Sequence, residues 1–201
     1  MRKATRPAMP VVLVENAERW NQQWAALRAS NPSAKFQWYE LEGRSARDWI
    51  LDDLSNMTTG HCSFCDSYPL ADRSSGGGPV EHFRPKYRPE FHFLAYEWTN
   101  LYYCCHQCQS NKGDQWDDLL LAPDHAGYDF QRYFAFDFTT GEILASPAAS
   151  TDDRLRAEVT IRVYGLDSPE RRRMRQLEAR KRIGSSETDL DVWAYRDFLE
   201  P

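Results

Sequence analysis

The sequence contains no run of about 18 apolar residues, which a membrane-spanning helix would require. Its first ten residues, MRKATRPAMP, lack the apolar core of a secretory signal. These two absences predict a cytoplasmic protein with no membrane partner. Internal repeats and a recognisable linker are absent as well, so we expect a single domain over residues 1–201 rather than a repeat array.

An excess of basic residues is also missing, because 25 Lys and Arg stand against 30 Asp and Glu. The net charge of −5 excludes a protein that coats nucleic acid through bulk positive charge. Phosphate contacts need only local clusters, and two are present. Arg84, Lys86 and Arg88 form the first, whereas the second, within residues 171–182, is equally well explained as the solvated face of a helix.

Cysteines are few, but four of the five form two tight pairs, Cys62/Cys65 and Cys105/Cys108. In a chain without an export signal, such pairs are better explained as metal ligands than as disulfides. Four thiolates at this spacing can close one tetrahedral zinc site, and we expect a structural zinc ion with all positions filled. The fifth cysteine, Cys104, is expected to be a buried thiol.

An acid and a histidine stand side by side between the two cysteine pairs, at Glu81 and His82. They are not needed to hold zinc, so they require a second explanation. Hydrolysis assisted by another metal ion supplies one. A hydrogen-bonded surface pair is the plainer alternative, but the position between two zinc half-sites favours catalysis.

The segment around these residues predicts a β-β-α unit. We expect strands at residues 80–83 and 101–104 and a helix from 105 to about 114, with Glu81, His82 and the helix facing one cleft. So short a unit has little apolar core, and zinc binding would supply folding energy directly. The tract SSGGG at residues 74–78 predicts a flexible loop.

The regions on either side of this unit carry clear secondary-structure patterns. Apolar residues at helical spacing predict helices at 14–30 and 44–54, whose aromatic side chains belong to the core. Alternation and a glycine-containing turn predict a β-hairpin at 133–144, and we expect a further strand at 157–163. A cap at Ser168 followed by proline predicts a basic helix that runs to about residue 183.

The expected fold class is therefore α+β, with a zinc-stapled β-β-α core. N-terminal helices fill residues 1–59, the zinc-bound core fills 60–116, and a C-terminal α/β extension with the hairpin, the strand and the basic helix fills 117–201.

The ordered constellation in the centre of the chain resembles the HNH endonuclease family. The matching residues are Cys62, Cys65, Glu81, His82, Asn100, Cys105, Cys108, Lys112 and Gly113. Three sequence segments, VEHFRPK, EWTNLYYC and CHQCQSNKG, are further similar to those of a bacterial HNH subgroup found beside ATPases in anti-phage systems, the Septu type and certain retrons. MRKATRP, YFAFDFTTGEI and VTIRVYGLD also resemble that subgroup, so the likeness covers most of the chain.

The resemblance implies a ββα-metal core that hydrolyses DNA phosphodiester bonds with Mg²⁺ or Mn²⁺. His82 would be the general base that activates water, and its ordinary pKa suits that task near neutral pH. Glu81 would ligate the catalytic ion, and Asn100 would orient the His82 ring through its amide oxygen.

Two positions depart from the family pattern. The family usually places His or Asn directly after the last cysteine as a second ligand for the catalytic ion, whereas this chain has Gln109. We favour Gln109 as that ligand, with Asn111 as the alternative, although two steps along a helix turn a side chain by about 200°. Glu81 stands where many relatives carry Asp, which moves the carboxylate outward by one methylene group.

Nucleic-acid contacts are expected from the basic residues beside this site, namely Arg84, Lys86, Arg88 and Lys112. For Lys112, solvation of the helix is an equally good explanation. The acidic net charge indicates control by a partner, and the subgroup resemblance would make that partner an ABC/SMC-type ATPase, with DNA cleavage released during phage infection.

Two other functions remain open on the sequence. The first is a non-catalytic zinc-binding adaptor for nucleic acid or protein, in which Glu81 and His82 are relics and Gln109 marks lost metal binding. The second is an RNA-directed nuclease.

Overall fold

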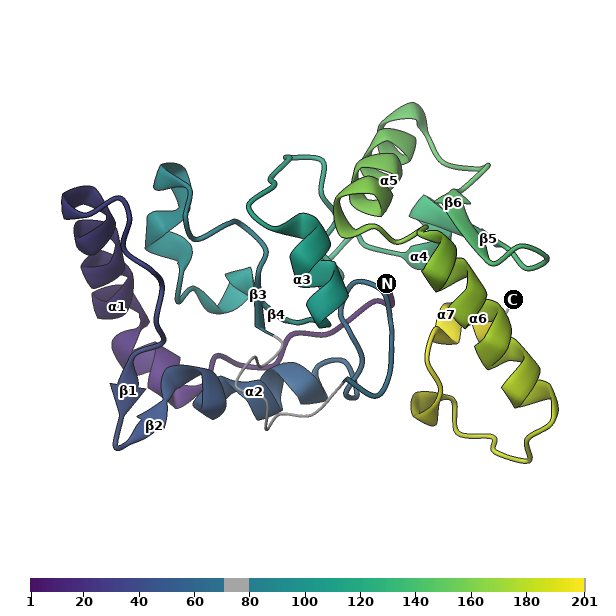
Figure 1. The fold of residues 1–201 in the computed structure, drawn as a ribbon, viewed down its shortest axis with the longest axis horizontal. Coiled ribbons are helices and arrows are strands. Elements are labelled where there is room, and N and C mark those ends of the chain that lie inside the picture. Colours follow the sequence, from purple (N-terminus) through teal and green to yellow (C-terminus); the bar gives the residue numbers. More distant parts are fainter. Residues whose placement is uncertain (71–79, 201) are drawn as a thin grey trace.

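The structure is a computed structural model of the 201-residue chain, and it describes residues 1–70 and 80–200 (Figure 1). The glycine-rich loop predicted at residues 74–78 lies outside the described residues. None of the described helices combines the length and the apolar character that crossing a membrane would require. The fold mixes α and β structure, and the described residues form three separate two-stranded antiparallel sheets among the helices.

The N-terminal part consists of two helices joined by a short hairpin. Helix α1 spans Val11–Ser30 and α2 spans Ala46–Asn56. Between them β1 (Glu40–Leu41) pairs with β2 (Arg44–Ser45). Both predicted helices are confirmed.

The aromatic stripe of α1 packs into the core, as its spacing predicts. Trp20 and Trp24 are each only 3% exposed, and each packs against other aromatic rings. Leu27, one turn further along α1, is 43% exposed. Trp49 of α2, an aromatic side chain predicted to belong to the core, is 36% exposed, so that assignment is wrong. The buried face of α1 ends before the last turn of the helix.

The central part contains a strand, a second strand and a helix in the predicted order. β3 (Val80–His82) pairs antiparallel with β4 (Leu101–Tyr103), and α3 (His106–Lys112) follows directly. Two short 3₁₀ helices, η2 (Pro89–Leu94) and η3 (Trp98–Asn100), lie in the connection between the strands. The strands and the helix therefore lie where the sequence predicts them.

The C-terminal part alternates short and long elements. The elements are α4 (Phe130–Tyr133), β5 (Phe134–Asp137), β6 (Glu142–Ala145), α5 (Thr151–Tyr164), α6 (Pro169–Ile183), η4 (Leu190–Val192) and α7 (Arg196–Leu199). The predicted hairpin is confirmed as β5 and β6. The start of α6 is also confirmed, because Ser168 caps the helix and Pro169 is its first residue.

The strand predicted at residues 157–163 is wrong, because these residues belong to α5. Ser150 caps this helix by accepting a hydrogen bond from the Asp153 amide, and Gly165 ends it in the left-handed conformation at φ 59°. The helix buries Ala157 and Thr160, three residues apart, and so presents one face to the core. Caps and packing outweigh the strand preference of the branched side chains.

Two hydrophobic clusters meet at the β3–β4 hairpin. Val80, Leu101 and Tyr103 face the cluster built with α1 and α2. Tyr102 and Cys104, which alternate with them, face the cluster built with the C-terminal elements. Side chains alternate across a strand, so this one hairpin forms a wall shared by both clusters.

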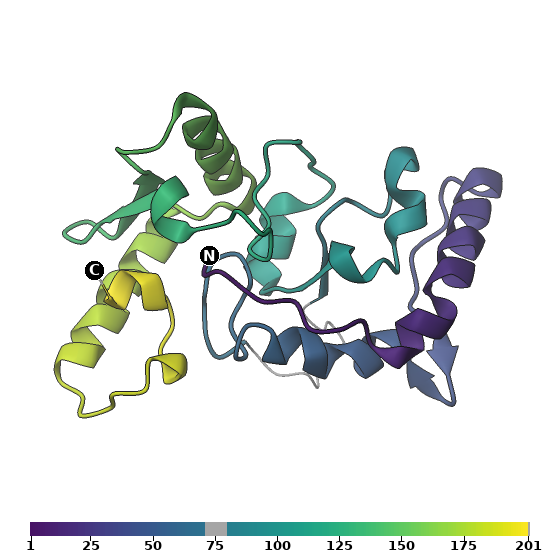
Figure 2. The ribbon, with the colours of Figure 1, turned by 180° about the vertical axis from the view of Figure 1, so that it is seen from behind.

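Figures 1 and 2 show the molecule from opposite sides, and both place the β3–β4 hairpin and α3 between the two ends of the molecule. Helices α1 and α2 lie on one side of this central unit. Helices α5, α6 and α7 lie on the other side. Residues 60–70 and 80–116 thus occupy the middle of the fold, where both flanking parts can contact them.

Candidate metal centre and adjacent polar pocket

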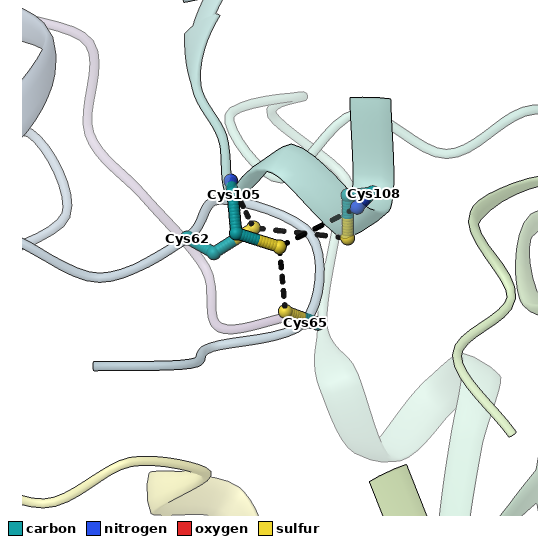
Figure 3. Close-up of side chains that lie close together, drawn as sticks. All are labelled: Cys62, Cys65, Cys105 and Cys108. Atoms are coloured by element: carbon teal, nitrogen blue, oxygen red, sulfur yellow. Dashed lines mark hydrogen bonds between the residues drawn. The ribbon is translucent and has the colours of Figure 1, made fainter. Parts of the chain in front are cut away.

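Four cysteine side chains converge at the start of α3 (Figure 3). The sulfur atoms of Cys62 and Cys108 are 3.8 Å apart, and those of Cys65 and Cys105 are 3.6 Å apart. Zinc–sulfur bonds of about 2.3 Å place the corners of a tetrahedral site about 3.8 Å from one another. The four thiols are free of disulfides, and their geometry and chemistry fit one zinc ion.

No other group of three His, Cys, Asp or Glu side chains within residues 1–70 and 80–200 is close enough together to hold a metal ion. Cys104 is fully buried and lies outside the four-cysteine cluster, as predicted. Burial raises the pKa of Cys65, but hydrogen bonds from Cys105 and Cys108 lower it, and the pKa of Cys65 falls to about 7. The pKa values of Cys105 and Cys108 are raised instead, by burial and by hydrogen bonds to the other thiols, so a zinc ion would have to displace their protons.

Glu81 lies at the other end of α3 and is only 7% exposed. Its Oε1 accepts a hydrogen bond from Lys112 Nζ at 2.7 Å, and the same ammonium group donates to the His82 carbonyl oxygen at 2.9 Å. Burial raises the pKa of Glu81, and the charge of Lys112 opposes that rise.

Lys112 does not lie at the surface of the cleft, which corrects both explanations that the sequence left open for it. The side chain is 1% exposed, because it extends from the last turn of α3 back to β3. Its ammonium group is the internal partner of Glu81, so in this conformation it reaches neither solvent nor a phosphate group.

His82 is 4% exposed and is held by backbone and aromatic contacts. Its Nε2 lies 2.9 Å from the Ala95 carbonyl oxygen, which can only accept, so Nε2 carries the proton and Nδ1 carries the lone pair. The ring stacks on Trp38 with centroids 5.5 Å apart. Lys86 Nζ lies 3.3 Å from Nδ1. Burial lowers the pKa of His82 well below its usual value, and the charge of Lys86 lowers it further.

Asn100 has a different contact from the one the family resemblance implies. Its Oδ1 accepts a hydrogen bond from the Arg84 amide at 2.7 Å, and its Nδ2 donates to the carbonyl oxygens of Arg84 and Leu94. The contacts of these described residues include none between Asn100 and the His82 ring, which is held by Ala95 instead. Asn100 therefore closes the loop that carries Arg84 and the residues after it.

A pocket of 260 Å³ brings the strand, the loop and the end of α3 together. It is lined by Val80, Glu81, His82, Pro85, Lys86, Gln109, Gly113 and Asp114. Gln109, the expected ligand of a catalytic ion, is among these lining residues, and its Nε2 donates to the Val80 carbonyl oxygen at 2.8 Å. The pocket therefore combines oxygen donors, an unprotonated imidazole nitrogen and an ammonium group.

Asn111 points away from this pocket, so the alternative metal ligand is not supported. Its Nδ2 donates to the Tyr164 carbonyl oxygen at 3.1 Å and packs against Gly165, where a Cβ atom would lie 2.2 Å from it. The 200° separation from Gln109 along the helix explains this placement.

Asp114 lines the pocket but is missed by sequence reasoning. It follows Gly113, whose positive φ of 49° ends α3 and turns the chain. A glycine that ends a helix directly before an acid is the signal that could have indicated it.

Of the other residues expected to contact nucleic acid, Lys86 lines this pocket, whereas Arg84 and Arg88 are not part of its lining. Arg84 is exposed, and its guanidinium lies over the Trp116 ring at 5.4 Å. Arg88 pairs with Glu90 at 3.5 Å, and Lys86 lines the pocket itself. Burial lowers the pKa of Lys86, and the nearby carboxylate of Glu81 opposes this change.

The second basic cluster is not a uniformly solvated helix face. Arg171 is 1% exposed and Arg175 is 2% exposed, so both belong to the interior. Arg175 donates to the Gly141 carbonyl oxygen at 2.7 Å, whereas Arg173 is exposed.

Comparison with known proteins identifies no relative: no protein-family model matches this chain, and no curated protein matches it.

Proposed function

We propose that this protein is a metal-dependent endonuclease that hydrolyses DNA phosphodiester bonds at the pocket containing Glu81 and His82. The single observation that carries the proposal is the state of His82. Its ring is fixed by the Ala95 carbonyl oxygen, which leaves the lone pair on Nδ1, beside Lys86 in a polar pocket. An imidazole held in this way can accept a proton from water.

His82 acts as the general base in this proposal. Because its pKa is lowered, the ring is neutral near pH 7 and can take a proton at Nδ1. The water that loses this proton attacks phosphorus, and the bond to the leaving oxygen breaks. Lys86 can donate to a non-bridging phosphate oxygen, since its ammonium group lies within 3.3 Å of the same Nδ1.

Oxygen donors for a divalent ion come from Glu81, Gln109 and Asp114, which line the same pocket. Mg²⁺ and Mn²⁺ prefer such oxygen ligands. A bound ion would stabilise negative charge on the phosphate and on the leaving oxygen. Lys112 contacts Glu81 at Oε1, so the ion would bind Glu81 through its second carboxylate oxygen. The zinc ion in this proposal is structural and takes no part in hydrolysis.

Plasmid cleavage by the zinc-loaded protein with Mg²⁺ or Mn²⁺ tests the proposal. We expect nicking or linearisation by the wild type and a loss on the order of 10²-fold or more in His82→Ala. His106→Ala is the matched control, because His106 is an exposed histidine of α3 outside the pocket. Equal cleavage by wild type and His82→Ala contradicts the assignment. An RNA substrate of the same length tests whether RNA is preferred.

A non-catalytic zinc-binding adaptor is the second candidate, and one contact favours it. Lys112 already neutralises Glu81 at 2.7 Å, so the pocket has no uncompensated carboxylate there. Mn²⁺ binding measured by electron paramagnetic resonance separates the two functions. An endonuclease should bind Mn²⁺ and lose affinity in Glu81→Gln, whereas an adaptor should show no binding that depends on Glu81.

We also propose an ABC/SMC-type ATPase as the partner that controls cleavage in anti-phage defence. This proposal is supported by the subgroup resemblance and by the net charge of −5, which does not favour unassisted binding to DNA. Co-purification of the protein with such an ATPase encoded beside it is the test, and failure of the two purified proteins to associate would reject the partnership.

A further inference from the structure

Each sulfur atom of the four-cysteine cluster has one further polar contact from outside the set of cysteine side chains. The Cys105 amide donates to Cys62 Sγ at 3.3 Å, the Cys108 amide to Cys105 Sγ at 3.4 Å, and Arg171 Nη2 to Cys108 Sγ at 3.2 Å, whereas the Cys65 thiol donates to Ser67 Oγ at 3.2 Å. Two of these are backbone amides and one is a hydroxyl group. Among the described residues, Arg171 provides the only charged donor.

A charged donor is important because the cluster itself is charged when it binds zinc. Zinc with four thiolates carries about two net negative charges, and burying such a group without compensation is unfavourable. Arg171 is 1% exposed. Its Nη2 donates to Cys108 Sγ at 3.2 Å. The guanidinium and the thiolate cluster therefore offset one another's burial.

No other hydrogen-bond partner among the described residues accounts for the burial of the Arg171 side chain. Its Nε has no hydrogen-bond partner among the described residues, although it is buried. The Nε of Arg175, the neighbouring buried arginine of the same helix, is also unpaired among the described residues, but its other two nitrogens donate to the backbone carbonyl oxygens of Gly141 and Leu166. Only the contact with Cys108 gives the buried guanidinium of Arg171 a specific partner.

The contact joins two distant parts of the chain. Cys108 belongs to α3, and Arg171 belongs to the first turn of α6, 63 residues later. Gln107 and Glu170, the residues directly before them, are also hydrogen-bonded at 3.4 Å. The first turn of α6 is thus attached to the first turn of α3, where two of the zinc ligands lie.

We propose that Arg171 is a positioning residue of the zinc centre, which compensates the charge on Cys108 and couples folding of α6 to metal binding. The inference rests on zinc binding, which is one part of the proposed function. It does not depend on nuclease activity. A charge-assisted hydrogen bond to a metal-bound thiolate stabilises the loaded state, and removal of such outer partners typically weakens metal binding.

Zinc affinity, measured by chelator competition on the full chain, is the first test. Arg171→Met keeps the volume of the stem but removes the donor and the charge, and we expect zinc binding about 10- to 100-fold weaker. Arg173→Met is the matched control, because Arg173 is exposed on the same helix, and its affinity should equal that of the wild type. Arg171→Lys should recover part of the loss because it restores the charge.

Cobalt(II) spectra separate a positioning role from a general effect on folding. In Arg171→Met the thiolate-to-cobalt charge-transfer absorption should move to lower energy, since one sulfur loses its N–H donor. The bands typical of four thiolate ligands should persist. Unchanged zinc affinity together with an unshifted charge-transfer band would overturn the inference. If Arg171→Met does not fold, Arg171→Lys is compared with wild type by the same two measurements.

Hydrogen exchange with and without chelator tests the coupling. In the wild type, zinc removal should increase amide exchange in α6 as well as in α3, whereas in Arg171→Met the exchange of α6 should no longer depend on zinc. Zinc-independent exchange of α6 in the wild type would overturn the coupling. A wild type that binds zinc but does not cleave DNA would reject the nuclease proposal and leave this inference standing.

Discussion

The two ends of α3 carry polar sites of different kinds. At its first turn, four thiols surround a space of zinc size, and each sulfur has a further polar contact. At its last turn, Glu81 is already paired with Lys112, while Nδ1 of His82 keeps a lone pair beside a 260 Å³ pocket. The first site needs a cation to balance its thiolates, whereas the second balances its own charges.

Because charge is balanced differently at the two sites, loss of a metal ion should affect the fold at the first site but not at the second. A site that depends on metal for charge balance should unfold when the metal or a ligand is lost. A site balanced by an internal ion pair should keep the fold without a divalent ion, and should be sensitive instead to loss of one partner of that pair. The comparison is tested by three predictions.

The largest effect is expected from Cys105→Ser. Structural zinc contributes about 10–16 kcal/mol of apparent binding free energy in small zinc-folded peptides, so loss of one thiolate should destabilise the central part severely. Zinc content by elemental analysis and thermal unfolding by circular dichroism are the measurements. His82→Ala is the control for zinc content, which should equal that of the wild type because His82 lies outside the four-cysteine cluster. Full zinc content and unchanged unfolding in Cys105→Ser would contradict the claim that the fold depends on metal at the four-cysteine site.

An intermediate effect is expected from Lys112→Met, which leaves Glu81 buried without its partner. Breaking a buried ion pair in this way costs about 3–5 kcal/mol. Burial already raises the pKa of Glu81, and loss of Lys112 raises it further. A carboxyl group whose folded pKa exceeds its unfolded value stabilises the fold at low pH and loses that contribution as pH rises.

The measurement for Lys112→Met is urea unfolding at several pH values. The variant should therefore be closest to wild type near pH 5 and furthest from it near pH 8. The double variant Glu81→Gln/Lys112→Met should recover stability at pH 8, because no charge is buried there. An equal deficit at both pH values would show that lost packing, rather than the charge of Glu81, causes the destabilisation.

Local sequence patterns predicted the sites unequally. The spacing of Cys62, Cys65, Cys105 and Cys108 predicted the cluster, because two ligands separated by two residues can bind one ion regardless of what surrounds them. The order of strand, strand and helix was also predicted, since it depends on short segments. Asp114 and Gln109 show the limit: both line the pocket, but only Gln109 was expected from a motif.

The contacts that were not predicted join segments far apart in the chain. Lys112 reaches Glu81 across 31 positions, and Arg171 reaches Cys108 across 63. No local pattern distinguishes a buried lysine or arginine from a solvated one, because burial depends on how the elements pack. The strand expected at 157–163 failed for the same reason: residue preferences indicated a strand, while the caps and the buried face of α5 produced a helix.

The smallest effect is expected from Lys86→Met, which tests how Lys86 affects His82 at the second site. Lys86 Nζ lies 3.3 Å from His82 Nδ1, and its positive charge lowers the pKa of that histidine in addition to burial. Removing the charge should raise the pKa of His82 toward its ordinary value, with little change in zinc content. NMR titration of the imidazole in the zinc-loaded protein, without Mg²⁺ or Mn²⁺, measures the change directly.

The direction of this pKa shift also predicts a change in the pH dependence of cleavage. A general base works only when unprotonated, so cleavage should fall as pH drops through the pKa of His82. In the wild type that decline should lie below pH 6.5, because the pKa is lowered. In Lys86→Met the decline should move to higher pH, and the maximum rate should also fall if Lys86 contacts the phosphate. An acid limb that stays in place while the NMR pKa rises would show that a group other than His82 takes the proton.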